Sequence, residues 1–196
     1  MSKILRLAVV LVVITFVAGV ALSYVHKITV EPIEYAQVKE VKAPAVAEVL
    51  GSLKPENDPV ADRKKLVVGK DKRGRDIMIF AFPAKKNGQT VAVAVETFGT
   101  GYHEGLGVMT AIGTEGEEKD KILQIAITSN SETPGKGTKA FQPAYLDQFK
   151  DLSAVETIGE GAVDAVSGAT MSSKGIVEAV NKAIEIFKAN QDKLIS

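Results

Sequence analysis

An apolar run near the N-terminus places the strongest constraint on this chain of 196 residues. Residues Leu7 to Val25 contain no charged side chain, and as a helix these nineteen residues extend about 28 Å, close to the hydrocarbon thickness of a bilayer. A cleaved signal peptide is the alternative, because Gly19-Val20-Ala21 and Ala21-Leu22-Ser23 both have the small residues of a cleavage site. The apolar core of a signal peptide is only about 7–15 residues long, so the length favours a membrane anchor, which we assign to residues 1–27.

The charges around this run predict its orientation. Two cations, Lys3 and Arg6, precede it. A mixed set of charges follows it: His26, Lys27, Glu31 and Glu34. Cationic residues are enriched on the cytoplasmic side of membrane helices. We therefore expect a single-pass protein of the inner (plasma) membrane, with a cytoplasmic N-terminus and the remaining chain outside the cytoplasm.

The composition excludes several classes of function. Lys plus Arg and Asp plus Glu both number 24, so the chain is formally neutral and has no basic stripe that would favour nucleic acid. It contains no cysteine, which excludes disulfides, thiolate metal sites and iron–sulfur ligation. Only His26 and His103 are present, which argues against a histidine-rich metal site. A hydrophobic content of 45% is enough for one globular domain, which we place at residues 51–196.

The remaining pattern predicts an α+β fold. Residues 28–50 have near-helical spacing of valines on both sides of Pro44, which predicts a juxtamembrane helix in two pieces. Alternating or continuous apolar runs predict strands at 76–83, 90–96 and 122–128, with a fourth candidate at 106–113. Polar or glycine-rich turns separate these runs, so we expect an antiparallel sheet.

Two further features complete the expected fold. The charged segment 70–76 reads as a hairpin tip centred on Gly74. The C-terminal part has the apolar stripe of a helix that packs against a sheet, made of Ile176, Val177, Val180, Ile184 and Phe187. The sequence therefore predicts a single membrane helix followed by one antiparallel sheet with flanking helices.

A loop of small residues, Asp164 to Gly175 (DAVSGATMSSKG), leads into this last helix. A Ser or Thr just before a helix normally caps it by accepting a hydrogen bond from a first-turn N–H group. The free N–H groups of a helix N-terminus also favour phosphate, and Gly168 would let another molecule approach the backbone. Thr170 can therefore be either an ordinary cap or the attachment point of a group.

The residues from Asp164 to Thr170 resemble, at every fixed position, the D-x-x-[ST]-G-A-T signature of the FMN-binding domain family. The resemblance implies that a flavin transferase attaches FMN through a phosphoester to Thr170. The family includes the G subunit of Rnf ferredoxin:NAD oxidoreductase complexes and the C subunit of the sodium-pumping NADH:quinone oxidoreductase. Its members have one N-terminal membrane helix and an outward-facing flavin domain.

Two other stretches add to this resemblance. The segment from Glu132 to Gly137 (ETPGKG) is similar to the family's E-T-P-G-x-G turn, which lies near the isoalloxazine ring. The Pro-Gly pair by itself predicts only a type II turn. The segment from Gly99 to Tyr102 (GTGY) matches a glycine-tyrosine loop more loosely, because His103 and Glu104 follow it. Lys136 stands where the family often has leucine, and it is either a solvated loop lysine or a cation that raises the flavin potential.

The resemblance implies a set of residues around FMN. In the signature loop, Thr170 is the covalent site, and Ser172 and Ser173 either cap the helix or bind phosphate oxygens. The remaining residues that we expect to contact the cofactor are Asp164, Ser167, Gly168, Ala169, Glu132, Thr133, Pro134, Gly135, Lys136 and Tyr102. For Asp164, the ordinary alternative is a turn carboxylate.

The function implied by the resemblance is electron transfer in an Rnf-type complex that moves Na⁺ or H⁺, with the other subunits of that complex as partners. The chain would then be a redox subunit and not an enzyme by itself. One alternative is the C subunit of the quinone oxidoreductase or a free-standing anchored flavoprotein, although the short chain favours the G subunit of an Rnf complex. A third hypothesis is an anchored scaffold without redox function, in which the SGAT sequence is only a helix cap.

Overall fold

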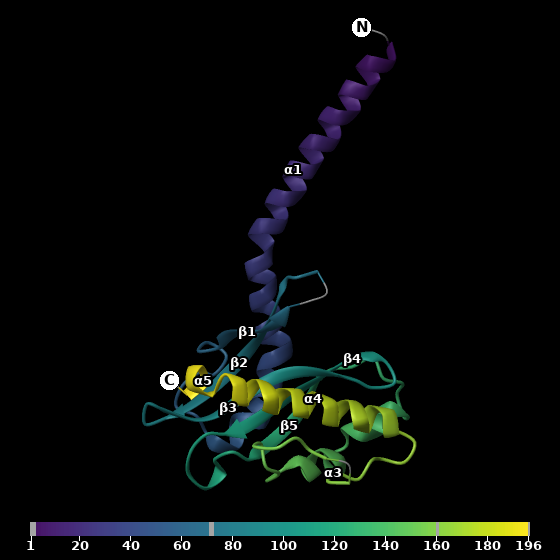
Figure 1. Ribbon diagram of the computed structural model, residues 1–196. Helices are drawn as coiled ribbons and strands as arrows, with labels where there is room; N and C mark the ends of the chain where they lie inside the picture. The colour runs from purple at the N-terminus through teal and green to yellow at the C-terminus, as the bar shows by residue number, and fades with distance from the viewer. Residues whose placement is uncertain (1–2, 71–72, 160, 196) are drawn as a thin grey trace. The chain divides into compact units, whose positions relative to one another are not determined.

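The computed structural model describes residues 3–70, 73–159 and 161–195. The chain divides into two compact units, Met1–Val41 and Lys42–Ser196. We describe each unit by itself. Figure 1 shows the helices and strands with the labels used below.

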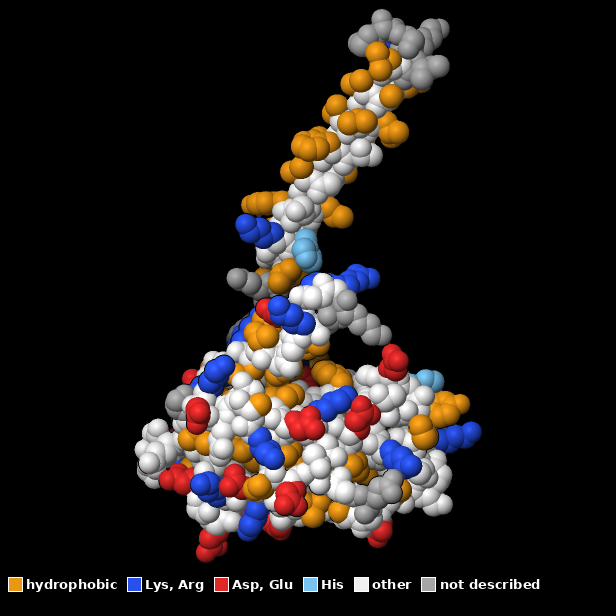
Figure 2. Space-filling view, in the orientation of Figure 1, with side chains coloured by type: hydrophobic (Ala, Val, Ile, Leu, Met, Phe, Trp, Pro, Cys, Tyr) orange, Lys and Arg blue, Asp and Glu red, His pale blue; other side chains and the backbone are white. Residues whose placement is uncertain are grey.

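The first unit is dominated by helix α1 (Lys3–Gln37). Its segment Leu5–Val30 has a mean hydropathy of 2.6 and is long and apolar enough to cross a membrane by length and composition. Figure 2 shows hydrophobic side chains along the length of this helix. The predicted membrane-length helix is confirmed, although it extends beyond Leu7–Val25 at both ends. The helix also continues through Pro32, which has no N–H group and therefore lacks one helical hydrogen bond.

The predicted interruption near Pro44 is also present. A π-helical turn (η1, Val38–Lys42) follows α1, and helix α2 (Ala43–Leu50) begins one residue before Pro44. Proline is tolerated there because first-turn N–H groups have no helical acceptor. The first piece of the expected juxtamembrane helix is, however, continuous with α1. A short 3₁₀ turn, η2 (Gly51–Leu53), leads from α2 into the loop before the sheet.

The sheet is a five-stranded antiparallel meander in the order β1-β2-β3-β4-β5. Its strands are β1 (Lys64–Lys70), β2 (Asp76–Lys86), β3 (Gln89–Thr100), β4 (Glu104–Gly113) and β5 (Ile122–Ser129). All four predicted strands are confirmed, and most are longer than expected. The predicted hairpin around Gly74 joins β1 to β2, and Gly74 has a φ of 77°; Asp71 and Lys72 of its tip lie outside the described residues. Sequence reasoning missed β1, an edge strand with lysines at both ends.

Short turns connect the later elements. They are η3 (Gly116–Glu118), η4 (Gly137–Phe141), α3 (Pro143–Leu146) and η5 (Asp147–Phe149). The chain ends with the long helix α4 (Thr170–Ala189) and the short helix α5 (Gln191–Ile195). Between η5 and α4 runs an irregular segment that ends in the signature loop.

Helices cover both faces of the sheet. Helix α4 lies across one face (Figure 1), where Ile176, Val180, Ile184 and Phe187 are buried against strands β3 and β4 as the apolar stripe predicted. Helix α2 packs mainly against β4 and β5 on the other face, close to an ion pair of 2.6 Å between Lys42 and the buried Glu96. The fold is therefore α+β, as expected, with a helix on each side of an antiparallel sheet.

A glycine contact brings the N-terminal part of α4 close to β3. A Cβ atom on Gly99 would lie 1.8 Å from the carbonyl oxygen of Gly175, and a Cβ atom on Gly175 would lie 2.8 Å from the backbone N of Gly101. Real Cβ contacts are not this short, so larger residues would push the helix away from the strand. This crossing fixes the position of the loop that precedes α4.

We expect Gly99→Ala to lower the free energy of unfolding by about 1–3 kcal/mol, because the added methyl group overlaps the backbone of α4. Urea denaturation of the detergent-solubilised chain measures this change. Gly51→Ala is the matched control, since a Cβ atom on Gly51 meets nothing within 4 Å. Equal stability of the two variants would show that the crossing of β3 and α4 does not require glycine at position 99.

Candidate functional site

Three segments that are distant in sequence meet at the N-terminus of α4. They enclose a cavity of about 410 Å³, a size typical of small-molecule sites. Its lining residues are Tyr102, Glu132, Thr133, Lys136, Gly137, Gly168, Ala169, Thr170, Met171 and Ser172. The signature loop, the E-T-P-G turn and the glycine-tyrosine loop therefore form one pocket, as the resemblance implies. Sequence reasoning had not assigned Met171 and Gly137 to it.

Thr170 is the first residue of α4, and its side chain is exposed at the edge of the pocket. The N-cap position belongs to Ala169, and no side chain caps the helix there. The interpretation of Thr170 as an ordinary cap is therefore wrong. An exposed hydroxyl beside the first N–H groups of a 20-residue helix suits the attachment of a phosphate.

Ser172 and Ser173 do not cap the helix either, which corrects one of the two roles expected for them. Both lie inside the first turns of α4, where their hydroxyls cannot replace the residue that precedes the helix. The Ser172 hydroxyl donates to Glu132 Oε2 at 2.8 Å. Ser173 Oγ accepts a hydrogen bond of 3.1 Å from the backbone N–H of Val166, so it stabilises the signature loop.

The signature loop has a defined conformation. The N–H group of Ala169 donates to the carbonyl of Val166 at 2.9 Å, and Gly168 has a φ of 79° inside this turn. Residues with a Cβ atom rarely adopt such a φ value. At the start of the loop, Gln148 Oε1 accepts from the backbone N–H of Asp164 at 2.9 Å. The loop is thus held by hydrogen bonds from its own backbone N–H groups, which leaves Thr170 at a fixed position.

Several expected site residues lie elsewhere. Asp164 and Ser173 line a second cavity of about 500 Å³, which also includes the buried phenol of Tyr145. Ser167, Pro134 and Gly135 do not line the first cavity. Pro134 and Gly135 instead shape the predicted type II turn, in which Lys136 N–H donates to the Thr133 carbonyl at 3.1 Å and Gly135 has a φ of 73°.

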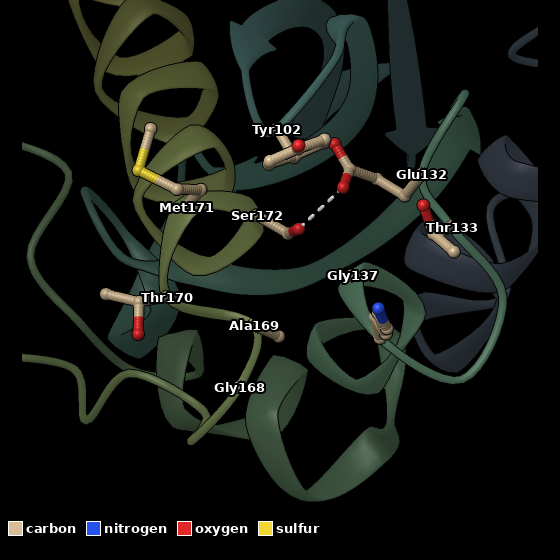
Figure 3. Close-up of a pocket in the computed structure, with 10 residues that line it drawn as sticks. Tyr102, Glu132, Thr133, Gly137, Gly168, Ala169, Thr170, Met171 and Ser172 are labelled. Carbon is tan, nitrogen blue, oxygen red and sulfur yellow. Dashed lines mark hydrogen bonds between the residues drawn. The ribbon is translucent and has the colours of Figure 1, made fainter.

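A buried carboxylate organises the pocket. Glu132 is only 5% exposed, and besides the bond from Ser172 its Oε1 accepts a hydrogen bond of 3.2 Å from the backbone N–H of His103. Figure 3 shows Glu132 and Ser172 facing each other, whereas Thr170 points in a different direction from the same helical turn. Glu132 therefore connects the E-T-P-G turn to both α4 and the β3–β4 connection.

Two glycines make room for this carboxylate. A Cβ atom on Gly101 would lie 2.3 Å from Glu132 Oε1, and one on Gly137 would lie 2.2 Å from Glu132 Oε2. A side chain at either position would overlap the carboxylate, so the close approach of the two segments to Glu132 requires glycine at both positions. The motif residues Gly101, Glu132 and Gly137 act as one packed unit.

Other polar contacts support the same end of the sheet. Glu178 on α4 accepts a hydrogen bond from Lys182 and one from the backbone N–H of Thr100 at 2.9 Å. The bond from Lys182, followed by that from Thr100, lowers the pKa of Glu178 below its usual value. The hydroxyl of Tyr145 donates to the carbonyl of Ser173 at 3.0 Å, and burial raises the pKa of this phenol. The bond from Tyr145 fixes the first turns of α4, and the bonds of Glu178 tie the middle of the helix to the end of β3.

The exposed edge of the pocket is aromatic and apolar. Tyr102 is 72% exposed, and its ring meets the His103 ring edge-on at a centroid distance of 5.0 Å. Met171 is also exposed on the opposite segment. A polar floor with apolar and aromatic side chains at the mouth fits a ligand with a planar ring and a phosphate end.

Comparisons with known proteins define the class of this domain. A model of the FMN-binding domain matches residues 101–185, which include all the residues that line the pocket. The chain is 31% identical to the G subunit of the Na(+)-translocating ferredoxin:NAD(+) oxidoreductase complex of Acetobacterium woodii, over 93% of this chain and 91% of that protein. The chain therefore belongs to the FMN-binding family that contains these G subunits.

Another relative and a solved structure are also similar to this chain. The G subunit of the ion-translocating oxidoreductase complex of Methanosarcina acetivorans is 28% identical, over 97% of both chains. The crystal structure of Shewanella oneidensis NqrC superposes with a TM-score of 0.59 and 18% identity, covering 81% of this chain and 98% of that chain. The second match shows that the fold is shared.

Proposed function

We propose that this protein is an electron-transfer subunit of a membrane-bound, ion-translocating ferredoxin:NAD⁺ oxidoreductase complex and has FMN attached to Thr170. The observation that supports this best is the single pocket formed by three family motifs, with an exposed Thr170 at its edge. Bound FMN would accept and donate one or two electrons, while the protein determines its position and potential.

The attachment uses Thr170 as a nucleophile only once. Its Oγ1 forms a P–O bond to the FMN phosphorus of FAD in the active site of a flavin transferase, the pyrophosphate bond breaks, and AMP leaves with the displaced proton. The free N–H groups of the first turn of α4 would be available to the resulting phosphate diester, and the positive end of the helix dipole would favour its charge. A covalent link prevents loss of FMN outside the cytoplasm, where no FMN pool is expected to replace it.

The other residues have supporting roles in this proposal. Gly168 and Ala169 present the threonine, and Asp164 with Ser167 belongs to the loop that the transferase recognises. Glu132, Thr133, Lys136 and Tyr102 line the pocket and would surround the ring side of the cofactor. The cations Lys3 and Arg6 favour a cytoplasmic N-terminus, so we expect the globular unit to lie outside the cytoplasm at the plasma membrane.

Electron transfer is tested in membranes that contain the whole complex. Ferredoxin-dependent reduction of NAD⁺ is expected with the unsubstituted chain and lost with Thr170→Ala, while the complex still assembles. Gentle purification identifies the neighbouring subunits. Full activity of the variant, or a protein that purifies without redox partners, would argue against this function.

Lys136 is expected to influence the flavin potential, because it lines the same pocket as Thr170. A nearby ammonium group stabilises the reduced flavin, which is more negatively charged. Lys136→Leu should lower the midpoint potential by roughly 10–30 mV, equivalent to about 0.5–1.4 kcal/mol for a two-electron couple. Spectroelectrochemical titration measures this value. Lys119→Leu, an exposed lysine away from the pocket, is the control; equal potentials in both variants would identify Lys136 as a solvated lysine.

A further inference from the structure

The outer part of the β1–β2 hairpin extends away from the five-stranded sheet. Strand β2 pairs with β1 from Lys70↔Asp76 to Lys64↔Ala81, whereas its pairing with β3 begins only at Ala81↔Val95. Residues 65–70 and 73–80 therefore form a two-stranded segment, which we call the outer ribbon. The paired residues Leu66 and Ile79 of this ribbon pack against the hydrophobic core, so the face available to a partner is the opposite one.

The outer ribbon exposes large apolar side chains. Val67, Ile77 and Met78 are 56%, 44% and 54% exposed. Val67 and Met78 are directly paired across the two strands, so their side chains lie side by side on one face. On strands β1 and β2 the exposed large apolar side chains all lie in the ribbon, because Ala81 and Phe82 further along β2 are fully buried.

The same ribbon has an excess of positive charge. Four exposed cations belong to it: Lys65, Lys70, Arg73 and Arg75. The only acidic residue among the described positions of the ribbon is Asp76. Figure 2 shows blue side chains at the end of the hairpin that Figure 1 labels β1 and β2. Because the whole chain has equal numbers of acidic and basic residues, this concentration of cations is local.

We propose that the outer ribbon binds the surface of an anionic lipid bilayer. The lysines and arginines contact lipid phosphates, while Val67 and Met78 enter the boundary between headgroups and acyl chains. Protein interfaces are usually poor in lysine, so the mixture of lysines and aliphatic side chains favours lipid. The chain between Val30 and Lys42 reaches at most about 40 Å, which keeps the globular unit near the membrane that the apolar helix enters.

The absence of cysteine makes a direct test possible in the full chain. A Met78→Cys variant is labelled with an environment-sensitive fluorophore and reconstituted into nanodiscs of phosphatidylcholine, with or without phosphatidylglycerol. In the anionic nanodiscs we expect a blue-shifted emission and at least a twofold increase in quenching by doxyl-labelled lipids. Glu115→Cys, on the exposed turn between β4 and β5, is the matched control and should show neither effect.

A charge reversal shows whether the blue shift of the Met78 label comes from binding to anionic lipid. Arg73→Glu combined with Arg75→Glu should return the Met78 label to its emission in water, and high salt should weaken the signal of the parent chain. An unchanged melting temperature shows that the double variant is folded. A label that stays in water in both nanodisc types overturns the proposal. A blue shift that needs the other subunits of the complex and no anionic lipid also overturns it, in favour of a protein partner. No flavin enters these measurements, so they are independent of the redox function.

Discussion

We expect Thr170→Ala to eliminate covalently bound flavin. The protein should be made with an active flavin transferase, denatured and separated on a gel, where ultraviolet fluorescence detects a flavin that survives denaturation. Thr170 has an exposed hydroxyl at the edge of the pocket, and alanine has no oxygen that could form the phosphoester. The fluorescence of the variant should therefore fall to background.

Neighbouring hydroxyls provide the controls for this result. Ser167→Ala removes another hydroxyl of the same loop and should retain a fluorescent band. Thr170→Ser retains a hydroxyl at the attachment position and should be labelled at a reduced level. A fluorescent Thr170→Ala protein would move the attachment site to another residue.

The second large effect is expected at Glu132. Glu132→Ala removes the acceptor for the Ser172 hydroxyl and the His103 N–H group and leaves a cavity between Gly101 and Gly137. Each buried polar group without a partner costs about 1–3 kcal/mol, so the free energy of unfolding should fall by roughly 2–4 kcal/mol. Urea denaturation of the detergent-solubilised chain measures this loss.

Glu132→Gln tests whether Glu132 stabilises the fold through its hydrogen bonds or through its charge. Its carbonyl oxygen can accept from His103 N–H while its amide donates to Ser172 Oγ, so both contacts can be kept. We expect a loss of only about 0–1 kcal/mol for this variant. Ser172→Ala leaves one carboxylate oxygen without its donor and should give an intermediate loss. Equal stabilities of the Ala and Gln variants would contradict this account of the pocket.

The sequence predicted the sheet well because its interior strands have clear apolar patterns. The runs at 90–96 and 106–113 became the central strands β3 and β4, each buried between two helices. Strand β1 was missed because an edge strand needs few buried residues, and its lysines look like part of a loop. Helix α1 was predicted too short because charged residues after Val25 do not interrupt a helix in water or at an interface.

The sequence predicted which motifs form the candidate site but not the contacts between their residues. Family resemblance identified the three segments, and the structure brings them together around one pocket. The burial of Glu132 depends on close approach of Gly101 and Gly137, which are remote from each other in sequence. The contacts of Ser172 and Ser173 depend on which side of α4 faces each segment, which a local capping rule does not describe. Met171 gave no signal because it lies one residue beyond the signature, which ends at Thr170.

The intact mass of the full chain tests the central claim most directly. The protein should be made with and without a flavin transferase that is shown to modify another substrate in the same cells. We expect a mass gain equal to FMN less water, present only with the transferase and located on the peptide that contains Thr170. An unmodified mass in the presence of the active transferase would contradict covalent attachment and leave a membrane-associated member of the family without its proposed cofactor link.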